Sequence, residues 1–210
     1  MIDFEEGFRQ LPLIAILRGI QPQEVLATVE SLVDAGFRLI EIPLNSPDPF
    51  TSIQRAADAF GDIAMIGAGT VLWKDDVERT LNAKGRLIVA PNFDKSVGEA
   101  AIACGATWAP GVATPTEAFG ALQAGAHALK IFPAEMVLPA GIKAMRAVLP
   151  SSARLLPVGG IDPESMGIYA AAGANGFGLG SALYRPGDSP SDTSRKAGAF
   201  VRSAKSLFGV

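Results

Sequence analysis

One lysine lies inside an apolar stretch of the chain. Residues 126–133 read AHALKIFP, and Lys130 is the one lysine or arginine among them. A short run of this kind, closed by a proline, is typical of a buried strand. Burial lowers the pKa of a lysine, and a neutral lysine amine can attack a carbonyl to form a Schiff base. The structural alternative is a lysine whose amine reaches water or pairs with a carboxylate.

Other reactive side chains lie at the ends of further apolar stretches. Arg18 in ILRGI, Glu41 in IEIPLN and Thr70 in GAGTV supply a cation, a carboxylate and a hydroxyl. Each also has a structural interpretation: Arg18 can pair with Glu41 or cap a helix, and Thr70 can be a helix N-cap. Together with Lys130 they indicate an anionic substrate that carries a carbonyl.

Two glycine-rich stretches near the C-terminus predict a phosphate site. VGGIDPES spans residues 158–165, and GLGSALY spans residues 178–184. Glycine lets an anion approach backbone N–H groups closely, and the start of a following helix favours negative charge. A simple tight turn is the alternative. The residues expected to contact phosphate are Gly159, Gly160, Gly180 and Ser181.

The elements that must position these residues follow a repeated pattern. A helical stretch ends in a small residue and glycine, which supplies a left-handed cap, and an apolar strand begins at once. The pattern occurs at residues 34–42, 103–110, 123–132 and 171–180, with a weaker copy at 83–91. Strands without this prefix are expected at residues 12–17, 62–68 and 154–159. Helical patterns follow each strand.

About eight such units predict an α/β fold, a (β/α)8 barrel near the lower size limit of that class. An open doubly wound sheet is the alternative, although no GxGxxG follows the first strand. No linker divides the chain, so we expect residues 1–210 to form a single domain.

Within the barrel, several smaller elements are expected. Residues 1–10 should form a short helix that closes the bottom of the barrel, and residues 184–192 a loop before the last helix. Helices are expected at residues 21–35 and 114–124. The second opens with Thr114 as N-cap, followed by a proline and then a glutamate, a capping box.

Composition narrows the functional class. Hydrophobic residues make up 49% of the chain, the net charge is -3, and no basic run indicates nucleic acid. No apolar stretch reaches the roughly 20 residues that span a bilayer. The first residues have neither a basic n-region nor an apolar h-region, so we expect no secretory signal and a cytoplasmic protein. With one cysteine and one histidine, a conventional zinc cluster is not expected. We expect Cys104 to be a small buried residue and His127 to pack against a helix without taking part in chemistry.

The chain resembles the pyruvate-dependent class I aldolases that act on 2-keto-3-deoxy-6-phospho sugar acids. The resemblance runs nearly end to end. The segments that carry it are LPLIAILRGI (11–20), AGFRLIEIPLNSP (35–47), IGAGTVL (66–72), ALKIFP (128–133), VGGI (158–161) and GLGSALYR (178–185). The resemblance implies a homotrimer of barrels with no metal or other cofactor, acting on a phosphorylated 2-keto-3-deoxy sugar acid.

Within this family, the sequence resembles the 6-phosphogalactonate branch more than the 6-phosphogluconate branch. The gluconate branch has an arginine in the stretch where this chain has Pro43 and Asn45, and a threonine where this chain has Val158. An isopropyl group in place of a hydroxyl beside the sugar hydroxyls favours a different C4 stereochemistry. The gluconate substrate stays open as the alternative. Residues 131–139, IFPAEMVLP, depart from the patterns of both branches.

The hypothesis that follows assigns a role to each residue. Lys130 forms a Schiff base with the substrate, and Glu41 is the general acid and base. Arg18 and Thr70 hold the substrate carboxylate, Phe132 stacks against the pyruvate part, and Val158 lies beside the sugar. Three alternatives are a phosphosugar isomerase or epimerase, a non-catalytic phosphosugar-binding barrel, and a metal-dependent aldolase.

Overall fold

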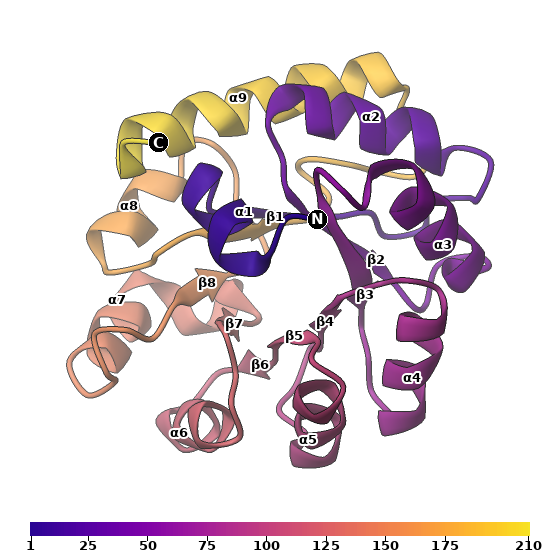
Figure 1. Cartoon of the computed structure of the whole chain (residues 1–210). Coiled ribbons are helices and arrows are strands. Elements are labelled where there is room, and N and C mark those ends of the chain that lie inside the picture. The colour runs from indigo at the N-terminus through magenta and orange to yellow at the C-terminus, as the bar shows by residue number, and fades with distance from the viewer.

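A ring of parallel strands occupies the centre of the computed structural model, which describes residues 1–210, and helices surround it (Figure 1). The strands are β1 Leu13–Ile16, β2 Leu39–Pro43, β3 Met65–Gly69, β4 Leu87–Val89, β5 Thr107–Ala109, β6 Gly111–Val112, β7 Leu129–Ile131, β8 Leu155–Pro157 and β9 Phe177–Leu179. The helices are α1 Phe4–Gln10, α2 Val25–Ala35, α3 Pro49–Phe60, α4 Lys74–Asn82, α5 Lys95–Ala103, α6 Pro115–Gln123, α7 Ala134–Arg146, α8 Met166–Ala171 and α9 Pro190–Phe208.

The strands close into a barrel. One run of pairing has the order β5-β4-β3-β2-β1-β9 and the other β6-β7-β8. β5 and β6 are two halves of one barrel strand, interrupted at Pro110, which has no N–H to donate. A backbone bridge between Val158 and Gly178 joins the end of β8 to β9. The predicted (β/α)8 barrel is therefore confirmed, and the open sheet is wrong.

The buried side chains form two clusters. The larger, of 47 residues, fills the layer between strands and helices. The smaller, of 10 residues, lies inside the barrel and includes Ile14, Leu87 and Leu156 together with Ile2 and Phe4 from the N-terminal segment. Phe4 is in α1, so this helix closes one end of the barrel, as predicted for residues 1–10.

Local capping follows the sequence at α6. The Thr114 side chain accepts a hydrogen bond from the backbone N–H of Glu117. The Glu117 carboxylate in turn accepts one from the N–H of Thr114, which completes the predicted capping box.

The loop predicted at residues 184–192 ends three residues earlier than expected, because the last helix, α9, already begins at Pro190. Ser189 is the N-cap of α9 and Pro190 its first residue, because a proline needs no N–H partner there.

Two residues singled out by the sequence lie away from the barrel mouth. Cys104 is exposed at the end of α5, so the prediction of a buried cysteine is wrong; the cap faces solvent where the chain turns back toward β5. His127 packs edge-on against Phe4 of α1, with ring centroids 6.3 Å apart, and its Nδ1 accepts a hydrogen bond from the N–H of Trp108. It therefore packs against a helix, as expected.

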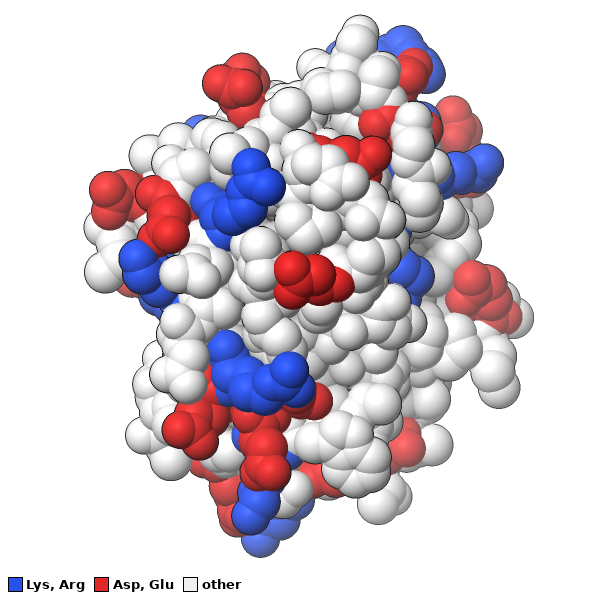
Figure 2. Space-filling model, turned by 90° about the vertical axis from the view of Figure 1, so that its right-hand side faces the viewer, with Lys and Arg blue, Asp and Glu red and all other residues white.

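Charges of both signs are interspersed on the face that Figure 2 shows, where no extended basic patch is visible. None of the helices is both long and apolar enough to cross a bilayer. No three His, Cys, Asp or Glu side chains are grouped in a way that would hold a metal ion.

Candidate active site

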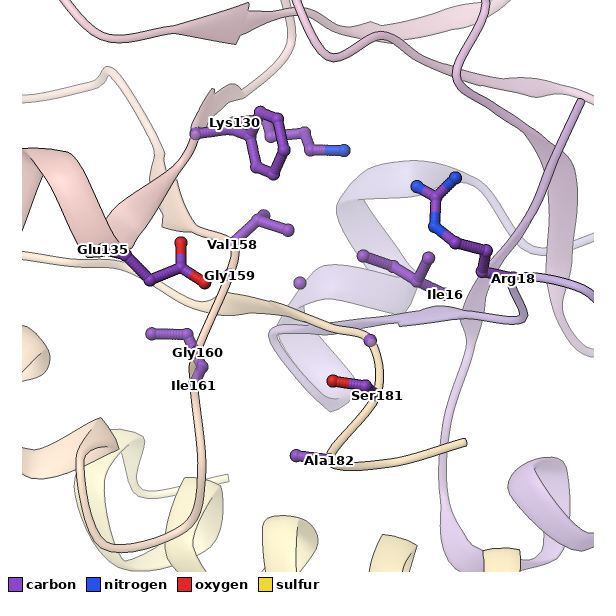
Figure 3. A pocket seen from close by; sticks show the side chains of 13 residues that line it. Ile16, Arg18, Lys130, Glu135, Val158, Gly159, Gly160, Ile161, Ser181 and Ala182 are labelled. Atoms are coloured by element: carbon purple, nitrogen blue, oxygen red, sulfur yellow. The ribbon is translucent and has the colours of Figure 1, made fainter. Parts of the chain in front are cut away.

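A pocket opens where β1, β7, β8 and β9 end (Figure 3). Three charged side chains lie in its wall, Arg18, Lys130 and Glu135. Most of the residues that the sequence predicted for the site line this pocket, namely Arg18, Lys130, Phe132, Val158, Gly159, Gly160, Gly180 and Ser181. The C-terminal strand ends of a barrel thus bring together residues from distant parts of the chain.

Lys130 is the central residue of β7 and points into the barrel. Its side chain is buried, and Nζ lies 5.0 Å from the centroid of the Phe132 ring. Burial lowers the pKa of this amine, the charge of Glu41 opposes that shift, and the charge of Arg18 reinforces it. The amine is thereby biased toward the neutral, nucleophilic form.

Glu41 lies beneath the pocket, in the middle of β2. It is fully buried, and neither carboxylate oxygen has a hydrogen-bond partner. Burial raises its pKa to about 7, although the charges of Lys130 and Arg18 pull the pKa down. Glu41 and Lys130 line the same small, mostly apolar cavity inside the barrel. A carboxyl group with this pKa can both donate and accept protons near neutral pH.

The guanidinium of Arg18 is held in place by two side chains. Nη1 donates to Oδ1 of Asn45 at 2.6 Å, and Nη2 donates to Oγ1 of Thr70 at 3.4 Å. The interpretation of Arg18 as an ion-pair partner of Glu41 is therefore wrong. Thr70 is no helix cap either, because Trp73 is the N-cap of α4. Thr70 has a φ of 56°, a left-handed conformation that is uncommon for threonine.

Asn45 was not among the predicted site residues. The sequence marked it only as a departure from the gluconate branch, and nothing local indicates that its amide contacts a residue 27 positions earlier. The contact arises because β1 and β2 are neighbours in the barrel and both side chains lie past their C-terminal ends. Arg18 is exposed on the pocket side, so its remaining N–H groups are available to a ligand.

The other end of the pocket is built from backbone. Gly159 and Gly160 both have positive φ, at 107° and 61°, which only glycine adopts easily. No protein group accepts a hydrogen bond from the N–H of Gly159, Gly160, Gly180 or Ser181. Successive free N–H groups in such turns form a concave anion site. The prediction that a helix N-terminus follows each glycine-rich stretch is wrong, because α8 begins only at Met166 and α9 only at Pro190.

Glu135 is a second functional candidate that was not predicted from the sequence. It lies in the first turn of α7, and its carboxylate packs against Gly159 and Gly160 so closely that a Cβ atom on Gly159 would overlap it. The sequence marked residues 131–139 as a departure from the family patterns but did not indicate what they contact. A backbone break at Leu138, with φ 49°, separates this first turn from the rest of α7.

Comparison with known proteins finds relatives that match most of the chain. The family model described as KDPG and KHG aldolase matches residues 4–190. The chain is 52% identical to the 2-dehydro-3-deoxy-6-phosphogalactonate aldolase of Escherichia coli (strain K12), over 92% of this chain and 95% of that one. It is 48% identical to a probable aldolase of the same name from Rhizobium meliloti (strain 1021), over 94% and 93%. A solved structure described as native KDPGal superposes with a TM-score of 0.93 at 50% identity, covering 96% of this chain and 98% of that one.

Proposed function

Because the chain belongs to the KDPG and KHG aldolase family, we propose that it cleaves 2-dehydro-3-deoxy-6-phosphogalactonate to pyruvate and D-glyceraldehyde 3-phosphate through a Schiff base. The observation that carries this proposal is the pair formed by Lys130 and Glu41 inside the barrel. Burial lowers the pKa of the amine and raises that of the carboxyl to about 7. An imine mechanism makes use of both shifts, whereas an isomerase or a binding protein has no use for a buried amine whose pKa is lowered.

The reaction begins at the C2 carbonyl. The neutral amine of Lys130 attacks C2, and a proton passes from nitrogen to the former carbonyl oxygen to give a carbinolamine. Glu41 donates a proton to that hydroxyl, which leaves as water, and an iminium remains. The iminium is an electron sink for the next bond to break.

Cleavage then takes place between C3 and C4. The carboxylate of Glu41 accepts the proton of the C4 hydroxyl, the C3–C4 bonding electrons pass into the iminium, and glyceraldehyde 3-phosphate leaves. Glu41 returns the proton to C3 of the resulting enamine. Water hydrolyses the new iminium, which releases pyruvate and regenerates Lys130. One carboxyl whose pKa is about 7 serves all the proton transfers.

The two ends of the substrate bind at opposite ends of the pocket. The guanidinium of Arg18, supported by Asn45 and Thr70, binds the substrate carboxylate, because its paired donors match two carboxylate oxygens. Phe132, whose ring lies near the lysine amine, covers the pyruvate part. The phosphate binds to the free backbone N–H groups of the two glycine-rich loops, those of Gly159, Gly160, Gly180 and Ser181.

The preference for the galactonate epimer rests on Val158 and on the relatives. Val158 lines the pocket between Lys130 and the glycine pair, and it presents methyl groups where a threonine would present a hydroxyl. The two relatives reported above share about half of their residues with this chain and carry the galactonate name. The same cleavage of the gluconate epimer is the alternative, and a direct comparison of the two substrates separates them.

The oligomeric state and the cellular location of the protein are also proposals. We propose a homotrimer in the cytoplasm, on the family resemblance. Large apolar side chains are exposed on the single chain, including Trp73 at 70% and Met136 at 78%, and such residues are suited to a subunit interface. Sedimentation equilibrium should give a mass of three chains; a monomer would overturn the trimer.

The experiment that tests the proposed function is borohydride reduction in the presence of pyruvate, followed by peptide mass spectrometry. We expect a pyruvyl adduct on Lys130, and EDTA should leave turnover unchanged. A folded protein without an adduct would overturn the imine mechanism, and loss of turnover in EDTA would favour a metal-dependent aldolase.

A further inference from the structure

We infer that Glu135 determines substrate specificity by accepting a hydrogen bond from the C5 hydroxyl of the sugar acid. The inference rests on the proposed aldolase function and adds a residue for which that function has no other role. Glu135 is the one carboxylate among the residues that line the pocket, and Arg18 and Lys130 are the cations among them. Figure 3 shows its side chain pointing toward Val158 and Gly159, on the pocket side of α7.

The placement follows from the order of groups along the pocket. Lys130 binds C2 of the substrate, and the glycine loops bind the phosphate on C6. Val158 lies between them, next to Gly159 and Gly160 (Figure 3). The carboxylate of Glu135 packs on the backbone of this glycine pair, with its Cγ 3.2 Å from where a Cβ on Gly160 would lie. It therefore faces the stretch of substrate between C4 and the phosphate.

The chemistry of the remaining groups makes the assignment specific. The substrate carboxylate, carbonyl and phosphate already have partners in Arg18, Lys130 and the free N–H groups, which leaves the sugar hydroxyls. A hydroxyl is a donor, and Glu135 makes no hydrogen bond or ion pair with any protein side chain. A carboxylate is an acceptor only, and hydrogen bonds to ionised groups are about twice as strong as neutral ones.

Glu135 could act in the opposite sense, by repelling the substrate instead of binding it. A carboxylate beside a phosphate site can also repel the substrate, and removing its charge would then improve binding. We favour the hydroxyl contact because the Glu135 side chain lies on the side of the glycines where a Cβ atom would be and accepts no hydrogen bond from their N–H groups, which have no protein acceptor and stay free for the phosphate.

The close fit also constrains the glycines. A side chain on Gly159 would overlap the carboxylate of Glu135, and both glycines have positive φ. The glycine pair therefore serves two purposes, because it exposes N–H groups toward the phosphate and leaves room for the carboxylate beside the sugar chain.

The test uses the full-length enzyme in the aldol direction, with pyruvate and either of two aldehydes. Glyceraldehyde 3-phosphate supplies the C5 hydroxyl of the product, and 3-phosphopropanal is the same length without it. Glu135→Gln should lower kcat/KM for glyceraldehyde 3-phosphate about tenfold, and Glu135→Ala at least as much. With 3-phosphopropanal both variants should stay within about twofold of the wild type.

A matched control is Glu78→Gln, which removes the same charge from an exposed position on α4 that does not line the pocket. It should leave both aldehydes unaffected. An equal loss of activity with both aldehydes, no loss, or a gain with glyceraldehyde 3-phosphate would overturn the inference. Borohydride trapping of pyruvate on Lys130 in the same preparations separates the two failures: a normal adduct with the wrong aldehyde pattern overturns only the role of Glu135, whereas no adduct in the wild type overturns the aldolase itself.

Discussion

The carboxylate of Glu41 packs directly onto Gly69 of the neighbouring strand. Residues of β2 and β3 are paired in parallel, and a Cβ atom on Gly69 would overlap the carboxylate. The absence of a side chain on Gly69 therefore creates the space in which the buried carboxyl lies. This contact links the packing of the barrel to the group proposed to move protons.

Gly69→Ala should force Glu41 from its place or strain the two strands. Overpacking of this kind costs about 1–3 kcal/mol of unfolding free energy, and we expect turnover to fall about a hundredfold or more because the acid-base group is displaced. Urea denaturation and steady-state kinetics measure both effects. Gly198→Ala, in the interior of α9, is the control and should be neutral or stabilising. Normal activity in Gly69→Ala would show that the contact is unimportant.

Lys130→Ala should remove turnover, by about four orders of magnitude or more, because no other amine is placed to form the imine. The protein should remain folded by circular dichroism, since the change removes a buried amine and leaves an apolar environment. Lys143→Ala, in the exposed part of α7, is the matched control. Near-normal turnover in Lys130→Ala would exclude this lysine as the nucleophile.

Glu41→Gln should lower kcat by about 10² to 10⁴, because a positioned acid-base group contributes that much. Some imine with pyruvate should still form, since the amine is intact, and borohydride trapping measures it. For the wild type we expect a dependence of kcat on a group whose pKa is about 7, and the variant should lack it. An unchanged rate would leave Glu41 with a purely structural role.

The same carboxyl should make stability depend on pH. Its pKa is raised from 4.5 to about 7 in the folded protein, so the folded state holds a proton that the unfolded state releases. The contribution of protonated Glu41 to the free energy of unfolding is therefore complete below pH 4.5. It is lost as the pH rises through 7, and the free energy of unfolding falls by about 3 kcal/mol. Denaturation of the wild type and Glu41→Gln across this range measures it. Parallel pH profiles would contradict the raised pKa.

Ser181→Ala should weaken binding of the phosphate end. Ser181 is exposed in the pocket wall, in the loop after β9, and loss of one hydrogen bond to a charged group raises KM about tenfold. The KM for the dephosphorylated substrate should not change. If both KM values rise together, the residue acts on the fold or on another part of the substrate.

Val158→Thr should shift preference toward the gluconate epimer, because it adds a hydroxyl beside the sugar hydroxyls. We expect the ratio of kcat/KM values for the two epimers to change by about tenfold, the worth of one hydrogen bond. Cleavage of both substrates by the wild type and the variant gives this ratio. The methyl groups of Val158 pack near Gly178, so thermal unfolding should accompany the kinetics.

Much of the barrel was predictable because its signals are local. Each strand is a short apolar run, each preceding helix often ends in glycine, and chain order alone places the strand ends on one rim. Lys130 was identifiable for the same reason, since a charge within an apolar run is visible without knowledge of any neighbour. The cap at Thr114 needed only a spacing of three residues.

The tertiary structure decided the features that depend on residues far apart in the chain. The raised pKa of Glu41 comes from complete burial inside the closed barrel. Arg18 donates hydrogen bonds to Asn45, 27 positions away, and to Thr70, instead of pairing with Glu41. Glu135 meets Gly159 only because α7 follows β7 and folds back over the end of β8. Sequence periodicity therefore determined the elements and the nucleophile, whereas burial and contacts between strands determined the protonation and the partners of the site, because both depend on distances that close only when the ring is complete.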